Sequence, residues 1–251
     1  MATITPIQPA DLDFDNGSFD SGAFAAQALS NWQSLASVID HTLLKPDATH
    51  AQVEMLCDEA IRYRFACAMV NPTWVSTAVA LLNGTGIPVG VVVGFPLGAS
   101  LVSTIRQEAS TLIRLGAREL DMVLPIGQLK SGNHHGVHHA IQAVANVAHH
   151  HGCLLKVILE TTLLTMEEKL RASEIAIQAG TDFLKTSTGF AAGGATAADV
   201  ALLRGVAGSR SGVKASGGIR TLADVRTMLE AGANRIGASA SVAIVRELGA
   251  E

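Results

Sequence analysis

The sequence is poor in charged and aromatic residues, which make up 16% and 4% of the chain, and it has no long apolar run. Its formal net charge of −4 gives no electrostatic reason to expect a nucleic acid as a partner. No apolar run approaches the roughly 18 residues that a membrane helix needs. The first residues also lack the basic and apolar regions of a signal peptide. We therefore expect a cytoplasmic protein that binds neither nucleic acid nor membrane.

Cysteine is scarce as well. Cys57, Cys67 and Cys153 are odd in number, and no two of them have the Cys-x-x-Cys spacing of redox and zinc motifs. We expect three reduced, buried thiols, as is usual in a cytosolic protein.

Histidine is the one residue type that clusters. His134 and His138, and likewise His135 and His139, are i,i+4 pairs that could chelate zinc or nickel on a helix. The favoured interpretation is a solvated helix on the outside of the protein. No metal and no cofactor are therefore expected at the functional site.

The length and apolar content suit one large α/β domain. A chain of 251 residues that is 48% hydrophobic can bury a large core, and its length is normal for a single barrel. Residues 1–34 differ, because they combine four aspartates with glycine and serine. We expect residues 1–34 to form a flexible or loosely docked N-terminal extension and residues 35–251 to form the catalytic domain.

A local pattern of helix, glycine and strand recurs along the chain. It is clearest at Leu115–Asp121, Ala179–Lys185 and Ala231–Gly237, and it is typical of parallel βα units. Extending the pattern predicts eight strands: Val38–Leu44, Ala66–Val70, Val89–Phe95, Glu119–Leu124, Leu154–Glu160, Asp182–Thr186, Val213–Ser216 and Arg235–Ala238. Eight such units predict a closed (β/α)₈ TIM barrel of the α/β class. The alternative is an open doubly wound sheet, but no Gly-x-Gly-x-x-Gly follows the first strand.

Two lysines and an aspartate stand out among the polar residues at the predicted strand ends. Barrel enzymes carry their active sites at these ends. Side-chain alternation points Lys185 and Lys214 inward from neighbouring strands, with Asp121 two strands before Lys185. One ammonium group lowers the pKa of another, and a neutral lysine attacks carbonyl groups to form a Schiff base. An aspartate nearby can move the protons of such a reaction.

Buried ion pairs are the structural alternative, because charges are rarely buried without a partner. Lys156 and Glu160 fit that interpretation, since alternation places both on one face of the fifth strand. Two lysines on adjacent strands are harder to explain as scaffolding, because their charges repel.

Glycine-rich loops follow the last two strands. Ser216-Gly217-Gly218 follows the seventh and Gly237-Ala238-Ser239 ends the eighth, where barrels commonly bind phosphate on backbone N–H groups. Gly189 could add a third piece. Glycines can also merely permit tight turns, so each loop alone is a weak signal. A lysine amine beside an anion cradle indicates a class I aldolase that acts on a phosphorylated sugar.

Several longer stretches resemble one family, the deoxyribose-phosphate aldolases, over about residues 38–245. The matching stretches are Ile39–Leu44, Val70–Pro72, Val93–Pro96, Glu119–Val123, Leu155–Thr161, Lys185–Gly189, Lys214–Arg220 and Arg235–Ser239. The resemblance implies reversible cleavage of 2-deoxy-D-ribose 5-phosphate to D-glyceraldehyde 3-phosphate and acetaldehyde. A homo-oligomer, either a dimer or a tetramer, is expected.

The resemblance also assigns roles. It implies that Lys185 is the Schiff-base nucleophile, that Asp121 donates and accepts protons, and that Lys214 perturbs the pKa of Lys185 and relays protons. The implied substrate-binding residues are Asp40, Thr42, Thr188, Gly189, Gly217, Gly218 and Ser239. Two positions depart from the family pattern: Phe190 stands where some relatives have lysine, and Ala240 where some have a second serine. Both departures predict a weaker hold on phosphate.

Three other functions remain open from the sequence. One is a class I aldolase for another small hydroxy-aldehyde. The second is a phosphosugar isomerase on the same barrel, which would not need two apposed lysines. The third is a phosphosugar-binding module without catalysis.

Overall fold

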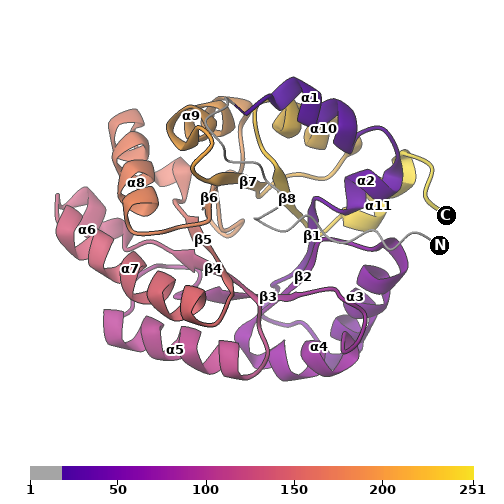
Figure 1. The fold of residues 1–251 in the computed structure, drawn as a ribbon, viewed down its shortest axis with the longest axis horizontal. Helices are drawn as coiled ribbons and strands as arrows, with labels where there is room; N and C mark the ends of the chain where they lie inside the picture. Colours follow the sequence, from indigo (N-terminus) through magenta and orange to yellow (C-terminus); the bar gives the residue numbers. More distant parts are fainter. Residues whose placement is uncertain (1–18) are drawn as a thin grey trace.

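Eight parallel strands form a closed barrel surrounded by helices in the computed structural model, which describes residues 19–251 (Figure 1). Each strand pairs with the next along the chain, and β8 pairs with β1. The strands are β1 (Ile39–Leu43), β2 (Cys67–Val70), β3 (Val89–Val93), β4 (Glu119–Val123), β5 (Leu154–Ile158), β6 (Phe183–Lys185), β7 (Gly212–Ser216) and β8 (Arg235–Ala238). The predicted (β/α)₈ barrel is confirmed, and the pairing of β8 with β1 excludes the open sheet.

Helices connect the strands on the outside of the barrel (Figure 1). They are α3 (His50–Tyr63), α4 (Val75–Leu81), α5 (Val102–Arg114), α6 (Ile126–Lys130), α7 (His134–His150), α8 (Met166–Gln178), α9 (Ala197–Ala207), α10 (Leu222–Glu230) and α11 (Ser241–Glu247), with short 3₁₀ turns η2 (Pro72–Trp74) and η3 (Thr161–Leu163). Threonines begin several of them: Thr165 and Glu168 form a capping box on α8, and Thr221 and Asp224 form one on α10. These side chains satisfy backbone N–H groups that the first helical turn leaves free.

The recurring glycines end helices as the sequence pattern predicts. Gly116, Gly180 and Gly232 have φ values of 109°, 94° and 114°, a range that side chains with a Cβ rarely adopt. Each lies two residues after a helix and leads the chain back toward the barrel.

The hydrophobic core lies between the strands and the helices. Outward-facing strand residues such as Val91, Leu120, Val157 and Ile236 are fully buried in it. The barrel interior is different, because several of its inward-facing residues are charged. The alternation of each strand therefore separates an apolar shell from a polar interior.

The first two helices pack against the end of the chain. Helices α1 (Ser21–Ala28) and α2 (Trp32–Ala36) lie beside α10 and α11 (Figure 1) and bury Ala25, Ala28 and Leu35 in the main core. Residues 1–18 of the expected extension lie outside the described residues, so its boundary at residue 34 stays a proposal. Within the part of the chain that the structure describes, no helix combines the length and apolar character required to span a bilayer.

Arg204 on α9 links the loop between α9 and β7 to the loop between α10 and β8. Its guanidinium group donates hydrogen bonds to the carbonyl oxygens of Gly232 (2.8 Å), Gly208 (2.8 Å) and Ser211 (3.0 Å), and to Asn234 Oδ1 (3.2 Å). Burial lowers the pKa of Arg204 to about 10, so the group is still charged at neutral pH. Arg204→Met leaves these buried acceptors without their donor. We expect it to lower the free energy of unfolding by about 3 kcal/mol, measured by denaturant titration.

Arg210→Met is the matched control. Arg210 is exposed in the loop after α9 and makes one side-chain hydrogen bond, to the Val206 carbonyl oxygen, so its replacement should change stability by less than about 0.5 kcal/mol. Equal effects of the two substitutions would contradict the structural role given to Arg204.

Candidate active site

A cleft of about 390 Å³ opens at the carboxyl ends of the strands. Its lining includes Thr42, Lys45, Lys185, Thr188, Gly189, Phe190, Lys214, Ser216, Gly217, Gly218, Arg220, Gly237 and Ser239. A larger depression of about 990 Å³ lies on the outer surface along α5, but Glu108 is the only ionisable residue in its lining. The chemistry therefore belongs to the smaller cleft, whose floor carries two lysines.

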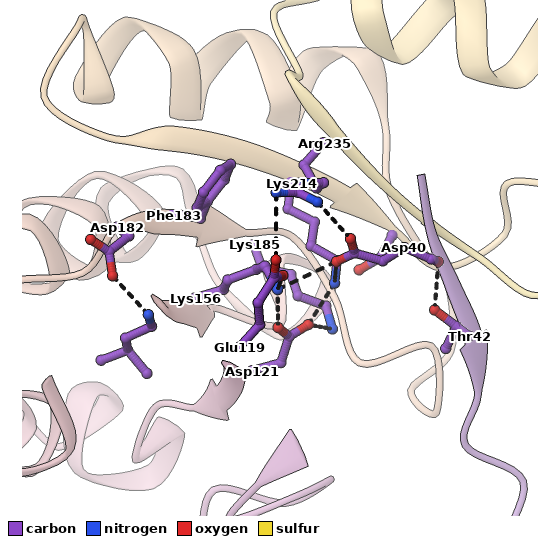
Figure 2. Close-up of polar contacts among 12 residues, drawn as sticks. Asp40, Thr42, Glu119, Asp121, Lys156, Asp182, Phe183, Lys185, Lys214 and Arg235 are labelled. Carbon is purple, nitrogen blue, oxygen red and sulfur yellow. Dashed lines mark hydrogen bonds and ion pairs between the residues drawn. The ribbon is translucent and has the colours of Figure 1, made fainter. Parts of the chain in front are cut away.

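Lys185, Lys214 and Asp121 meet at the floor of this cleft (Figure 2). Lys185 on β6 and Lys214 on β7 are register partners on adjacent strands. Both Nζ atoms donate hydrogen bonds to the same oxygen, Asp121 Oδ2, over 2.7 Å each. The lysine side chains are 3% exposed or less and Asp121 is fully buried. One carboxylate thus lies between two amines, within reach of any group bound to Lys185.

Asp40 lies below the cleft. Its carboxylate is fully buried, accepts a hydrogen bond from Lys214 Nζ, and accepts another from Arg235 over 3.1 Å. It is the one expected substrate-binding residue that does not line the cleft. Thr42, two residues further on, does line it and donates its hydroxyl to the Asp40 carbonyl oxygen over 2.8 Å.

A second group of charges fills the barrel beneath these residues (Figure 2). Lys156 Nζ lies 2.9 Å from Asp121 Oδ1 and 2.5 Å from Glu119 Oε2. Arg235 contacts Glu119 over 3.7 Å as well as Asp40. The contacts of Lys156, Glu119 and Arg235 with Asp121 and Asp40 were not predicted from the sequence. Side-chain alternation on β4 and β5, which points Glu119 and Lys156 inward, was a usable signal for two of them.

The expected pairing of Lys156 with Glu160 is wrong. Strand β5 ends at Ile158, and Glu160 has a φ of 58°, so the chain has left the strand before it reaches Glu160. The Glu160 carboxylate instead accepts hydrogen bonds from the backbone N–H (3.2 Å) and the hydroxyl group of Thr188. A left-handed residue that is not glycine is strained, and here it holds the loop that lines the cleft.

Burial and neighbouring charges separate the pKa values of the lysines. Burial lowers the pKa of Lys185 to about 8; Asp121 opposes this shift and Lys214 adds to it. Burial would also lower the pKa of Lys156, but Asp121, Asp40 and Glu119 hold it well above its usual range. Of Lys185 and Lys156, Lys185 is therefore the amine that can lose its proton near pH 8, while Lys156 stays charged.

Asp121 remains ionised among these amines. Burial alone would raise its pKa, but Lys156, Lys185 and Lys214 hold it well below the usual range. The site thus combines an amine that can be neutral with an ionised carboxylate 2.7 Å away.

The cleft wall opposite the amines is made of backbone. Gly189, Gly217 and Gly218 have φ values of 84°, 88° and 81°, so glycine is required at all three turns. The loop after β6 packs directly on the loop after β7: Ala195 N–H donates to the Gly217 carbonyl oxygen over 3.0 Å, and a Cβ on Gly194 would lie 2.2 Å from that oxygen.

The charge lining the cleft is positive. Lys45, Lys185, Lys214 and Arg220 contribute four basic groups, and among residues 19–251 no carboxylate is part of the lining. Lys45 and Arg220 were missed in the sequence because both lie in loops. In contrast with the chain as a whole, the cleft therefore attracts anions.

Phe190 forms an apolar part of the cleft mouth. Its ring is half exposed and packs edge-on against Phe95, with ring centroids 5.2 Å apart. Thr188, two residues earlier, accepts a hydrogen bond from the Phe190 N–H over 3.0 Å. Since its hydroxyl group already donates to Glu160, Thr188 has little hydrogen-bonding capacity left for a ligand.

The interior cluster does not fit a metal ion. Asp40, Cys67 and Glu119 offer ligand atoms within 4.8 Å of one another. Lys156 and Arg235, however, already contact both carboxylates, and burial raises the pKa of the Cys67 thiol well above its usual value. A cation would have to displace these ammonium and guanidinium groups and ionise a buried thiol.

The closed barrel and its amine-bearing mouth are the arrangement expected of a (β/α)₈ enzyme that acts on carbonyl groups. A model of the DeoC/LacD family of aldolases matches residues 34–247, so the chain belongs to that family. It is 53% identical over 212 residues to deoxyribose-phosphate aldolase of Geobacillus sp. (strain WCH70), covering 84% of this chain and 95% of that one. It is 54% identical to deoxyribose-phosphate aldolase of Listeria monocytogenes, with the same coverage.

A solved relative has the same fold. Deoxyribose phosphate aldolase from Aeropyrum pernix, described as a unique tetrameric structure, superimposes with a TM-score of 0.84 at 34% identity. The match covers 91% of this chain and 96% of that chain. The resemblance seen in the sequence is thus confirmed at the level of the family.

Proposed function

We propose that this aldolase cleaves 2-deoxy-D-ribose 5-phosphate reversibly to D-glyceraldehyde 3-phosphate and acetaldehyde through a Schiff base on Lys185. The observation that carries the proposal is the pairing of Lys185 with Asp121 at 2.7 Å on the floor of a positively charged cleft. The names of relatives above 50% identity support the substrate.

The proposed reaction begins when the neutral Lys185 amine attacks C1 of the open-chain sugar. Loss of water gives an iminium ion. Asp121 then accepts the proton of the C3 hydroxyl group, and the C2–C3 bond breaks as its electrons move to the iminium. The phosphorylated aldehyde leaves. The enamine left on Lys185 is protonated at C2 and hydrolysed, which releases acetaldehyde and the free amine.

Lys214 supports this sequence without bonding to the substrate. Its ammonium group shares Asp121 Oδ2 with Lys185 and also contacts Asp40. It therefore stabilises the ionised form of Asp121 and connects the two carboxylates along one line of proton donors and acceptors. Through this contact Lys214 can return a proton to Asp121 after each transfer.

The phosphate group of the substrate would lie at the glycine loops. Gly217 and Gly218 supply backbone turns, Ser239 a hydroxyl group, and Arg220 a guanidinium group, all within the cleft lining. Phe190 supplies no charge at this mouth, so backbone N–H groups and Arg220 carry phosphate recognition.

A coupled assay tests the proposed reaction directly. Acetaldehyde, the product that both sugars would give, is followed with phosphorylated and with free 2-deoxyribose at the same concentrations. We expect kcat/KM to be at least about tenfold higher for the phosphorylated sugar, because one charge-assisted hydrogen bond contributes about 1.5–3 kcal/mol. Equal values would favour an aldolase for another small hydroxy-aldehyde.

Two further outcomes would contradict the proposed reaction. A ketose phosphate formed without acetaldehyde would indicate an isomerase. Saturable binding without any product would indicate a binding module. We further propose a homo-oligomer, as in the tetrameric Aeropyrum relative, and light scattering of the full chain would reveal its mass.

A further inference from the structure

Three buried charged residues lie beneath the catalytic cluster and outside the cleft lining (Figure 2). Glu119 Oε2 lies 2.5 Å from Lys156 Nζ, in an ion pair that lacks hydrogen-bond geometry, and Glu119 Oε1 lies 3.7 Å from Arg235. Arg235 donates to Asp40 Oδ1 over 3.1 Å. These side chains are at most 6% exposed, so solvent screens them little.

Among the residues that the structure describes, the ionisable groups inside the barrel come close to electrical balance. They are Asp40 on β1, Cys67 on β2, Glu119 and Asp121 on β4, Lys156 on β5, Lys185 on β6, Lys214 on β7 and Arg235 on β8, while β3 contributes Gly90 and Val92. The Cys67 thiol is neutral because burial raises its pKa. Four basic groups thus face three carboxylates. The cluster carries one positive charge when Lys185 is protonated and none when Lys185 is neutral.

We propose that Glu119 and Arg235 act as positioning residues that set the protonation state of Lys185 through the charge balance of this cluster. Neither touches the cleft. The proposal rests on the proposed function only in taking Lys185 as the reacting amine.

The geometry provides two routes for this influence. The first is direct, because Glu119 lies two residues below Asp121, about 7 Å along the strand, and Asp121 contacts Lys185. Over on the order of 10 Å and at an effective dielectric constant of about 20, a unit charge shifts a pKa by about one unit.

The second route passes through shared partners. Lys156 forms ion pairs with three carboxylates, those of Glu119, Asp121 and Asp40. Without Glu119, Lys156 pairs more strongly with Asp121, and Asp121 then stabilises the Lys185 ammonium group less, so the pKa of Lys185 falls. Without Arg235, Asp40 pairs more strongly with Lys214. Asp121 is then less engaged by Lys214 and stabilises the Lys185 ammonium group more, so the pKa of Lys185 rises. Both routes give opposite signs for the two residues.

Competitive acetylation measures the pKa of Lys185 without any substrate. Trace labelled acetic anhydride is added across pH 6–10, and the label is quantified on the peptide that contains Lys185. The parent should titrate near pH 8, as burial implies. In Glu119→Gln the midpoint should fall by about one pH unit, and in Arg235→Gln it should rise by about one pH unit. The double variant, which removes one charge of each sign, should return close to the parent.

Charge-retaining variants separate this effect from damage to packing. Glu119→Asp and Arg235→Lys keep the charges while changing the contacts, so their midpoints should stay within about 0.3 pH unit of the parent. Folding of every variant is checked by circular dichroism. If Glu119→Gln does not fold, the comparison of Arg235→Gln with Arg235→Lys decides alone.

Midpoints that move in the same direction in both neutral variants, or that do not move in folded protein, would overturn the proposal. Deoxyribose phosphate cleavage is assayed separately on the parent. Absence of cleavage would refute the proposed function, whereas the labelling midpoints test the charge balance whether or not cleavage occurs.

Discussion

Lys185→Met is expected to lower kcat/KM by a factor of about 10⁴ or more, because covalent catalysis ends with the amine. Methionine has a similar length and no charge, so the barrel should still close around it. Removal of Lys185 leaves Asp121 with Lys156 and Lys214, both of which remain in contact with it. The measurement is the coupled assay for glyceraldehyde 3-phosphate, with thermal unfolding as the check on folding.

Lys130→Met is the matched control for this substitution. Lys130 is about half exposed on α6 and bonds to Glu168, away from the cleft lining. It should keep full activity. Activity of Lys185→Met within about tenfold of the parent would show that the amine is not the nucleophile.

Asp121→Asn is expected to lower kcat by about 10³, within the range that a positioned proton donor or acceptor contributes. The amide keeps the shape but cannot take up a proton or neutralise three lysines. Schiff-base formation and cleavage of the C2–C3 bond should respond differently to this substitution. Loss of a carboxylate lowers the pKa of Lys185, since Asp121 now holds that pKa up against burial. The Lys185 amine should therefore still bind aldehydes, while cleavage fails.

Single-turnover trapping separates these two steps. Borohydride reduction with acetaldehyde should label Asp121→Asn as fully as the parent, although substrate turnover is lost. Asp58→Asn, at an exposed position on α3, serves as the control. Equal losses of trapping and turnover in folded Asp121→Asn would place Asp121 in amine positioning rather than in proton transfer.

The pairing of Lys185 with Lys214 across adjacent strands could be predicted because it follows from local rules. Each predicted strand alternates, and parallel strands end at one face of the barrel. Register brings Lys185 opposite Lys214 and Asp121 opposite Lys156, and the Asp121 carboxylate contacts all three amines. No strand boundary shifted by more than two residues. On β5 the strand ends at Ile158 because Glu160 adopts a left-handed conformation that its residue type does not signal.

The lower charged cluster could not be predicted, because barrel closure creates it. Arg235 and Glu119 lie on strands that are far apart in the chain and do not pair with one another. Only the stagger of the closed sheet brings both to the same depth, where Arg235 reaches Asp40 and Glu119. Sequence alternation gives the face of a side chain and leaves its depth open.

The basic loop residues that line the cleft could not be predicted from the sequence either. Lys45 and Arg220 follow strands β1 and β7, and nothing in their local sequence distinguishes them from solvated surface residues. Thr188 lines the cleft, and its role in binding substrate stays a prediction, because its N–H and hydroxyl groups already donate to Glu160.

The central claim is that Lys185 bonds covalently to the substrate, and reductive trapping tests it most directly. The full-length protein is incubated with 2-deoxyribose 5-phosphate and borohydride, and its intact mass and proteolytic peptides are measured. The mechanism predicts one substrate-derived adduct per chain, located on Lys185 and absent from Lys185→Met. An adduct on Lys214 or Lys156 instead, or complete turnover with no adduct at any lysine, would contradict it.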